Sequence, residues 1–252
     1  MSGKTLHSAM ILLILGNALA VLSDVVVKIM GTDAPVFQFM FIRTLITVVL
    51  LLPFYRQFNL TRPFAGLAVH TIRATTALFG IFCMVIALTN LPLATANAVF
   101  YVAPLIVMLL AVVIFHEKLT WLSVLAVLSG FFGTLVILCP TEFNWGALAV
   151  LGGAAALAIN AVLVRKLPTE QTTIHKLMIS HLLMLPLAAI LFIWELSTGK
   201  THWQPDILVY AFASGALILV YSLTVLLAYR SVDAIKVTSA EYTGLVWAVL
   251  IG

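Results

Sequence analysis

The chain consists of long apolar stretches separated by short polar ones. Most stretches run for about 20 residues, the length that an α-helix needs to cross the hydrocarbon core of a bilayer. The ten-residue alternation of a membrane β-barrel does not occur. The pattern therefore predicts an all-α polytopic membrane protein, in which short connections make neighbouring helices antiparallel. Nine spans are expected, at Ser8–Met30, Val36–Tyr55, Gly66–Thr89, Thr95–His116, Leu119–Leu138, Trp145–Arg165, Ile174–Glu195, Ile207–Tyr229 and Val232–Gly252.

Composition agrees with this pattern. Hydrophobic residues make up 63% of the 252 positions and charged residues only 9%, whereas about a quarter of a soluble protein is charged. These values exclude a soluble domain, a disordered chain, a nucleic-acid-binding protein and a secreted disulfide scaffold. The two cysteines, Cys83 and Cys139, lie in apolar runs and lack metal or redox spacing.

The basic residues predict the orientation of the chain. With a cytoplasmic N-terminus, only Lys28 and Lys200 lie on the outer side. Basic residues concentrate in cytoplasmic loops, so this asymmetry places the N-terminus inside. The residues then on the cytoplasmic side are Lys4, Arg56, Arg62, Lys118, Arg165, Lys166, Lys176 and Arg230.

The sequence resembles itself at an offset of 137 to 141 residues. The first half, 1–140, holds five spans, an odd number, so the second half, 141–252, enters the membrane in the opposite sense. Inverted repeats of this kind are a transporter architecture. The aligned segments are Asp24–Met30 with Ala161–Leu167, Phe39–Arg43 with Leu177–His181, and Ala87–Pro104 with Ala228–Leu245, the last including the identical pair Tyr101 and Tyr242.

The two halves resemble the paired five-helix repeats of the EamA-type transporters, in the drug/metabolite transporter superfamily. The resemblance covers nearly the whole chain. The segments that carry it are Asp24–Lys28, Arg43, Leu91–Ala98, Pro104, His116–Thr120, Ala158–Lys166 and Ser231–Ala234. It implies an inverted repeat of two EamA-like units and transport of small metabolites, and leaves the substrate open.

The resemblance also implies ten spans, with a second acidic motif like the one at Glu117. At the repeat offset, Gly252 corresponds to about Val112, inside the fourth span. We expect a C-terminal truncation that removes the tenth helix, and a natural nine-helix protein is the alternative.

Charged residues inside the spans are the candidate functional groups, because a charge within the bilayer is costly. At 1.5 Å per residue, Arg43, His181 and Glu241 fall within roughly 5 Å of the midplane, and Asp24 and Arg73 lie roughly 7 Å from it. These residues come from five helices and both halves, as a substrate site between the repeats requires.

Each of these residues also has a structural interpretation. Arg43 either binds an anionic substrate or neutralises Glu241 in an ion pair within the bundle. His181 either carries protons or hydrogen-bonds a neighbouring helix. Asp24 either belongs to the site or pairs with Lys28 one turn along the same helix.

Uncharged polar residues lie near the same depth. Hydroxylated aromatic rings can stack on a planar metabolite and hydrogen-bond it, although interhelical hydrogen bonds are an equally good reason for such residues. We include Asn97, Tyr101, Asn160, Tyr221 and Tyr242 as substrate-binding candidates. Pro104 and Pro186 are expected to kink their helices or shape the packing.

No enzyme motif is found, since His116-Glu117-Lys118 lacks the second histidine of a zinc site and no nucleotide-binding glycine pattern occurs. We therefore predict a secondary transporter of small polar or amphipathic metabolites that works by alternating access, with proton coupling as an option. The alternatives are a membrane enzyme acting on a lipid-linked substrate and a non-transporting receptor. The expected partners are a small-molecule substrate and the lipid bilayer, with no cofactor, metal or nucleic acid. A bacterial inner membrane is the expected location, and the oligomeric state is open.

Overall fold

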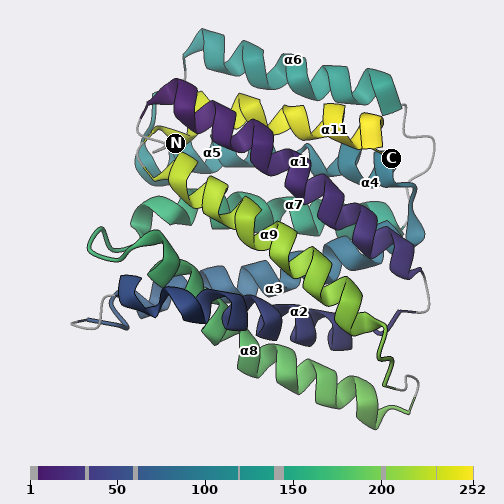
Figure 1. Ribbon diagram of the computed structural model, residues 1–252. Helices are drawn as coiled ribbons and strands as arrows, with labels where there is room; N and C mark the ends of the chain where they lie inside the picture. Colours follow the sequence, from purple (N-terminus) through teal and green to yellow (C-terminus); the bar gives the residue numbers. More distant parts are fainter. Residues whose placement is uncertain are drawn as a thin grey trace.

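The computed structural model describes residues 5–31, 34–58, 62–118, 120–138, 145–199, 203–230 and 232–251. Six of the residues named above lie outside these ranges: Lys4, Leu119, Cys139, Lys200, Ser231 and Gly252. The described chain is an antiparallel bundle of helices (Figure 1). Its α-helices are α1 (Leu6–Met30), α2 (Val36–Leu51), α3 (Leu67–Asn90), α4 (Leu93–Phe100), α5 (Ala103–Phe115), α6 (Trp121–Leu138), α7 (Trp145–Leu163), α8 (Thr173–Ser197), α9 (Ile207–Tyr229), α10 (Ala234–Val237) and α11 (Thr243–Ile251).

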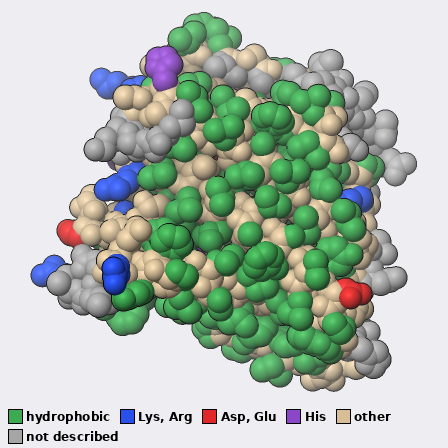
Figure 2. Space-filling model, viewed as in Figure 1, with side chains coloured by type: hydrophobic (Ala, Val, Ile, Leu, Met, Phe, Trp, Pro, Cys, Tyr) green, Lys and Arg blue, Asp and Glu red, His purple; other side chains and the backbone are tan. Residues whose placement is uncertain are grey.

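The predicted all-α membrane fold is confirmed. Each of the nine apolar segments is mainly helical in the residues that the structure describes. Within the described residues, six helices are long and apolar enough to cross a membrane: Leu6–Met30, Val36–Gln57, Leu67–Asn90, Leu148–Lys166, Thr173–Ser197 and Ile207–Tyr229. Apolar side chains cover the face seen in Figure 2, and most of the basic side chains seen there lie along the edge near the N-terminus. Such an apolar exterior suits contact with lipid.

The fourth predicted span is two helices rather than one. It breaks at Tyr101 and Val102, between α4 and α5. Pro104, at the start of α5, has no N–H with which to continue the hydrogen-bond ladder of α4, and it restricts the residue before it. The expected kink at Pro104 is therefore a full interruption. Pro186, in contrast, lies inside an unbroken α8.

The ninth predicted span is also interrupted. The short helix α10 is followed by a 3-10 helix, η3 (Thr238–Tyr242), and then by α11. No proline accompanies this break. Instead, the amide of Asn17 on α1 donates hydrogen bonds to the carbonyls of Ala240 and Glu241, at 3.2 and 3.1 Å. A neighbouring helix thus stabilises the irregular backbone, as interrupted membrane helices require.

The helices pair in a reciprocal way across the two halves. Helix α1 packs on α9, and α7 packs on α3; α2 packs on α9, and α8 packs on α3. Likewise α5 packs on α7, and α11 packs on α1, while α2 and α8 pack on each other. Exchanging each helix for its counterpart at the repeat offset leaves this set of pairs unchanged. The interface between the halves therefore runs through the centre of the bundle.

Candidate functional site

Two adjoining cavities lie at the centre of the bundle. The larger has a volume of about 240 Å³ and is enclosed mainly by α1, α2, α3, α7, α8 and α9. Its charged and polar lining includes Asp24, Arg43, Arg73, Asn160, His181 and Tyr221. These side chains come from both halves of the chain, so the cavity lies between the halves.

The smaller cavity, of about 50 Å³, continues toward the two interrupted spans. It is lined by Asn97, Tyr101, Tyr229 and Glu241, among others. Both cavities share a wall that includes Asp24 and Tyr221. Of the nine residues predicted for the site, eight therefore line one cavity or both.

Tyr242, the ninth, lines neither cavity. Its ring lies 5.8 Å from that of Tyr101, in a tilted arrangement. A Cβ atom at Gly244 would clash with the Tyr101 hydroxyl, so the first half approaches the backbone of α11 closely here. The two tyrosines aligned by the repeat thus meet where the two interrupted spans come together. Tyr242 packs against the ring of Tyr101 without lining either cavity.

Arg43 has a different partner from the one expected. It interacts electrostatically with Asp24 of α1, and its guanidinium lies 5.7 Å from the centre of the Phe39 ring. The expected ion pair with Glu241 does not form among the described residues, because α2 packs on α8 and α9 whereas η3 packs on α1, α5 and α6. Nor does Asp24 pair with Lys28, whose ammonium donates to the carbonyls of Leu88 and Leu91 at 2.8 and 2.6 Å.

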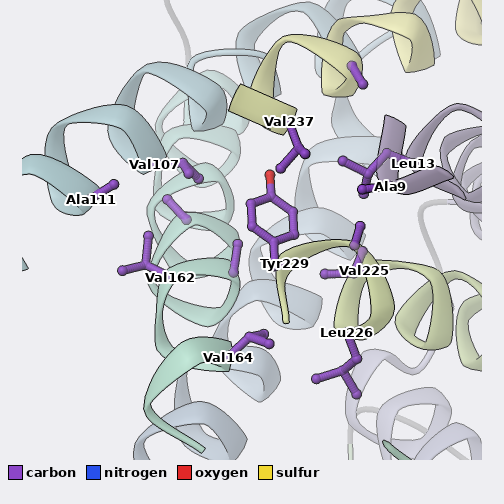
Figure 3. Packing of buried hydrophobic residues seen from close by; sticks show 14 of the residues in the cluster. Ala9, Leu13, Val107, Ala111, Val162, Val164, Val225, Leu226, Tyr229 and Val237 are labelled. Carbon is purple, nitrogen blue, oxygen red and sulfur yellow. The ribbon is translucent and has the colours of Figure 1, made fainter. Parts of the chain in front are cut away.

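Glu241 is held by a tyrosine. The hydroxyl of Tyr229, at the end of α9, donates a hydrogen bond to Oε1 of Glu241 over 3.0 Å. Tyr229 is fully buried in the apolar cluster of Figure 3, with Val107 and Val237 nearby. The carboxyl is therefore buried with a neutral hydrogen-bond partner, which permits either the protonated or the ionised form.

His181 is the repeat counterpart of Arg43 and lies on α8, which packs on α2. Its Nδ1 lies 2.9 Å from the carbonyl oxygen of Leu177. A carbonyl only accepts, so Nδ1 carries a hydrogen and Nε2 is the ring nitrogen available for a ligand or a proton. The expected hydrogen bond to a neighbouring helix is replaced by one within α8.

Asn160 links α7 to α3 at the larger cavity. Its side-chain amide donates to Oγ1 of Thr76 at 2.7 Å, and its backbone carbonyl accepts a hydrogen bond from Nε of Arg73 at 3.3 Å. At the corresponding place between α1 and α9, the hydroxyls of Ser23 and Ser214 are 2.7 Å apart. Polar contacts thus hold both helix pairs together beside the cavity.

Sequence reasoning missed two residues of the site. Tyr229 gave no signal, because nothing in the sequence shows that its hydroxyl reaches Glu241. Arg73 did give one, since an arginine inside an apolar span is itself unusual. Arg73 lies at about the same depth as Asp24 and lines the larger cavity with it, but the predicted set of nine includes only Asp24 of the two.

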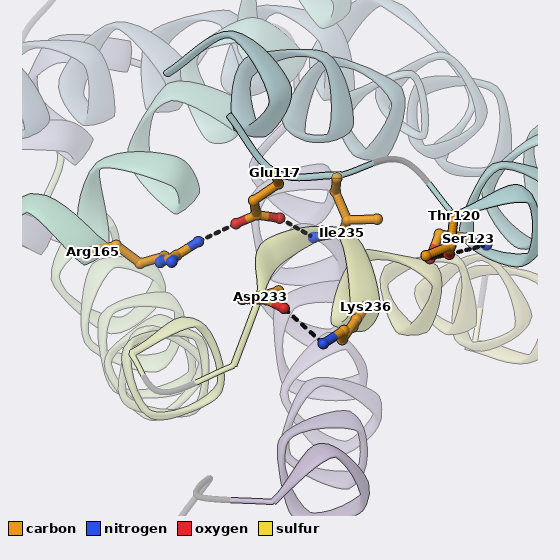
Figure 4. Close-up of polar contacts among 7 residues, drawn as sticks. All are labelled: Glu117, Thr120, Ser123, Arg165, Asp233, Ile235 and Lys236. Carbon is orange, nitrogen blue, oxygen red and sulfur yellow. Dashed lines mark hydrogen bonds and ion pairs between the residues drawn. The ribbon is translucent and has the colours of Figure 1, made fainter. Parts of the chain in front are cut away.

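A further polar cluster links the halves at the end of the bundle that bears most of the basic residues (Figure 4). Glu117, just after α5, forms an ion pair with Arg165, which follows α7. The other oxygen of Glu117 accepts a hydrogen bond from the backbone N–H of Ile235 in α10, at 3.3 Å. One carboxylate therefore bridges three segments beneath the cavities.

No group of three or more metal-ligating side chains occurs in the part of the chain that the structure describes. The arrangement instead combines a central cavity with charged and polar groups in its lining, interrupted helices and an apolar exterior. These features define a membrane transporter, in which unwound helix segments contribute to a central substrate site.

Comparison with known proteins identifies the family. Residues 7–139 match the EamA-like transporter family, and the chain belongs to this family. It is 27% identical over 234 residues to an S-adenosylmethionine uptake transporter of Rickettsia prowazekii (strain Madrid E), covering 89% of this chain and 76% of that protein. The corresponding protein of Rickettsia conorii (strain ATCC VR-613 / Malish 7) is 28% identical over 241 residues, with coverages of 90% and 77%.

A riboflavin transporter of Vibrio cholerae serotype O1 (strain ATCC 39315 / El Tor Inaba N16961) is 25% identical over 217 residues, covering 82% of this chain and 70% of that protein. Family and relatives agree that the protein is a small-metabolite transporter and not an enzyme. The resemblance to EamA-type transporters predicted from the sequence is confirmed.

Proposed function

We propose that the protein transports an S-adenosylmethionine-like metabolite, a small molecule that combines a planar ring with charged groups. The observation that carries the proposal is the pair of adjoining cavities between the halves, whose lining combines charged side chains with the aromatic rings of Phe100, Tyr101 and Tyr221. S-Adenosylmethionine has an adenine ring, a sulfonium cation and an amino-acid group. The ring suits the tyrosines of the smaller cavity, and Asp24, which lines both cavities, suits the cation.

Riboflavin is the second candidate substrate, since a relative is named for it. Its ring system also suits stacking on Phe100, Tyr101 and Tyr221. It carries no charged group to use Asp24 and the arginines. Buried charges are costly to keep in a membrane unless they serve a ligand or a partner, so the charged lining favours the first candidate.

The mechanism we propose is alternating access between two inverted repeats, 1–140 and 141–252. The reciprocal packing of α1 on α9 and α7 on α3 supports such a repeat. The Glu117–Arg165 ion pair and the Glu117–Ile235 hydrogen bond join the halves at one end. In this mechanism they break when the cavity opens toward that end.

We further propose an inner-membrane location with a cytoplasmic N-terminus, so that the Glu117 cluster lies on the cytoplasmic side. The bias of basic residues supports this orientation. Coupling to protons would then act through Glu241, whose position on an interrupted helix lets a change in η3 alter its surroundings.

The experiment is uptake of labelled S-adenosylmethionine into proteoliposomes that hold the purified full chain. Saturable uptake, inhibited by unlabelled S-adenosylmethionine and weakly by riboflavin, is expected. The reverse order of inhibition would favour the riboflavin-like class. The assay is repeated with labelled riboflavin. Uptake of both labelled compounds no greater than in protein-free liposomes would overturn the proposed function.

A further inference from the structure

The guanidinium of Arg73 includes a donor, Nη1, that forms no hydrogen bond with the described residues. The side chain is only 8% exposed, and Nε donates to the backbone carbonyl of Asn160. Its Nη1 is buried and has no hydrogen-bond partner among the residues that the structure describes. A buried donor without an acceptor is costly, and a guanidinium offers five donors in a fixed fork. The free end of this fork belongs to a residue that lines the larger cavity.

A second cation lies near Arg73. Lys176 on α8 is close enough to interact with it electrostatically, and the rings of His70 on α3 and His181 on α8 also lie close to it. Among the described residues, Arg73 forms no ion pair. The carboxyl group of Asp24, which also lines the larger cavity, interacts electrostatically with Arg43. A buried cation in a helix bundle needs an anion or a polar group as its partner. No carboxyl group of the described residues forms an ion pair with Arg73, so that partner is not supplied in this way.

We propose that Arg73 is an anion subsite that binds the carboxylate of the transported metabolite. This inference rests on the proposed function and deepens it, because it specifies an amino-acid-type carboxylate as part of the substrate. The carboxylate accepts hydrogen bonds from the free side of the guanidinium, in the geometry that favours Arg over Lys. The rest of the molecule extends along the cavity toward Phe100 and Tyr221, which line both cavities.

The test compares two competitors of labelled S-adenosylmethionine uptake in proteoliposomes: unlabelled S-adenosylmethionine and its decarboxylated form, which lacks only the carboxylate. In the wild type, the decarboxylated form should inhibit about 10- to 100-fold more weakly, as expected for loss of a charge-assisted hydrogen bond. In Arg73→Gln the two competitors should inhibit about equally. Arg73→Lys, which keeps the charge but not the fork, should retain part of the preference.

The possible failures are distinguishable. Wild-type protein without S-adenosylmethionine uptake overturns the proposed function, and the subsite with it. Wild-type uptake with equal inhibition by both competitors overturns the subsite alone, and this comparison needs no variant. A folded Arg73→Gln protein that keeps the wild-type preference also overturns it. If Arg73→Gln does not fold, Arg73→Lys decides, because an undiminished preference in that variant contradicts recognition by the fork.

Discussion

Tyr229 and Glu241 are joined by a hydrogen bond of 3.0 Å from the hydroxyl to the carboxyl group, next to the smaller cavity. The tyrosine ends α9 and the glutamate lies in η3, so the bond fastens an interrupted span to a continuous one. A proton that enters or leaves Glu241 changes the strength of this bond. Coupling between protonation and helix position is therefore available at this pair.

Glu241→Gln should leave the protein folded but abolish accumulation of substrate against a gradient. The amide keeps the shape of the side chain, and its oxygen still accepts a hydrogen bond from the Tyr229 hydroxyl. Unlike the carboxyl group, it does not gain or lose a proton over the physiological pH range. Downhill exchange should persist in part. The measurement is uphill and downhill transport in vesicles with an imposed proton gradient.

Glu195 offers a matched control, because it is similarly buried but accepts hydrogen bonds from the backbone N–H groups of Phe37 and Gln38 at the start of α2. Glu195→Gln should lower thermal stability and leave the response to the proton gradient unchanged. Normal uphill transport by Glu241→Gln would leave Glu241 with a structural role only.

The Glu117–Arg165 ion pair is predicted to keep the cavity closed at its end of the bundle. Its loss in Glu117→Gln should favour the form open to that side by about five-fold, the equivalent of about 1 kcal/mol for a modest ion pair. The measurement is the rate of maleimide reaction at Ser222→Cys, which lines the larger cavity, in protein lacking the two native cysteines.

Lys118→Gln is the control for this measurement, because it removes an exposed charge from the adjacent position. It should leave the maleimide rate unchanged. Equal rates in Glu117→Gln and Lys118→Gln would show that the ion pair does not hold the closed form.

Asn17 is predicted to stabilise the break in the ninth span. Asn17→Leu removes the donor that reaches the carbonyls of Ala240 and Glu241, and should cost about 1 to 3 kcal/mol of unfolding free energy. Thermal unfolding in detergent measures the loss. Asn90→Ala is the comparison, since the Asn90 amide bonds to Ile86 of its own helix and to Thr89 and is exposed. A smaller loss in Asn17→Leu than in Asn90→Ala would contradict this role.

The orientation is tested by placing single cysteines at opposite ends of α8. Both chosen residues are exposed: Thr169 precedes the helix, and Ser197 is its last residue. In intact cells, an impermeant thiol reagent should label Ser197→Cys and leave Thr169→Cys unlabelled until the membrane is opened. The opposite result would place the N-terminus outside.

The sequence was enough to locate the helices, because a membrane span needs a long apolar run and the run can be read directly. It also identified most of the cavity lining, since charges at Asp24, Arg43 and Glu241 are conspicuous in apolar segments. It could not assign their partners. Arg43 meets Asp24 and Glu241 meets Tyr229 only because of which helices pack together.

The two helix interruptions differ in whether the local sequence predicts them. The break before Pro104 follows from a local property, the missing N–H of proline. The break around Glu241 depends on Asn17, more than 220 residues away in the chain. Because its stabilising contact is long-range, no local sequence pattern predicts this break.

The most direct test is counterflow through the central cavity. Proteoliposomes preloaded with unlabelled S-adenosylmethionine should transiently accumulate labelled S-adenosylmethionine above its external concentration. Asp24→Asn, which alters the residue common to both cavities, should abolish this overshoot in folded protein, whereas Asp206→Asn, exposed just before α9, should retain it. An undiminished overshoot in Asp24→Asn, or none in the wild type, would contradict the claim that this cavity carries the substrate.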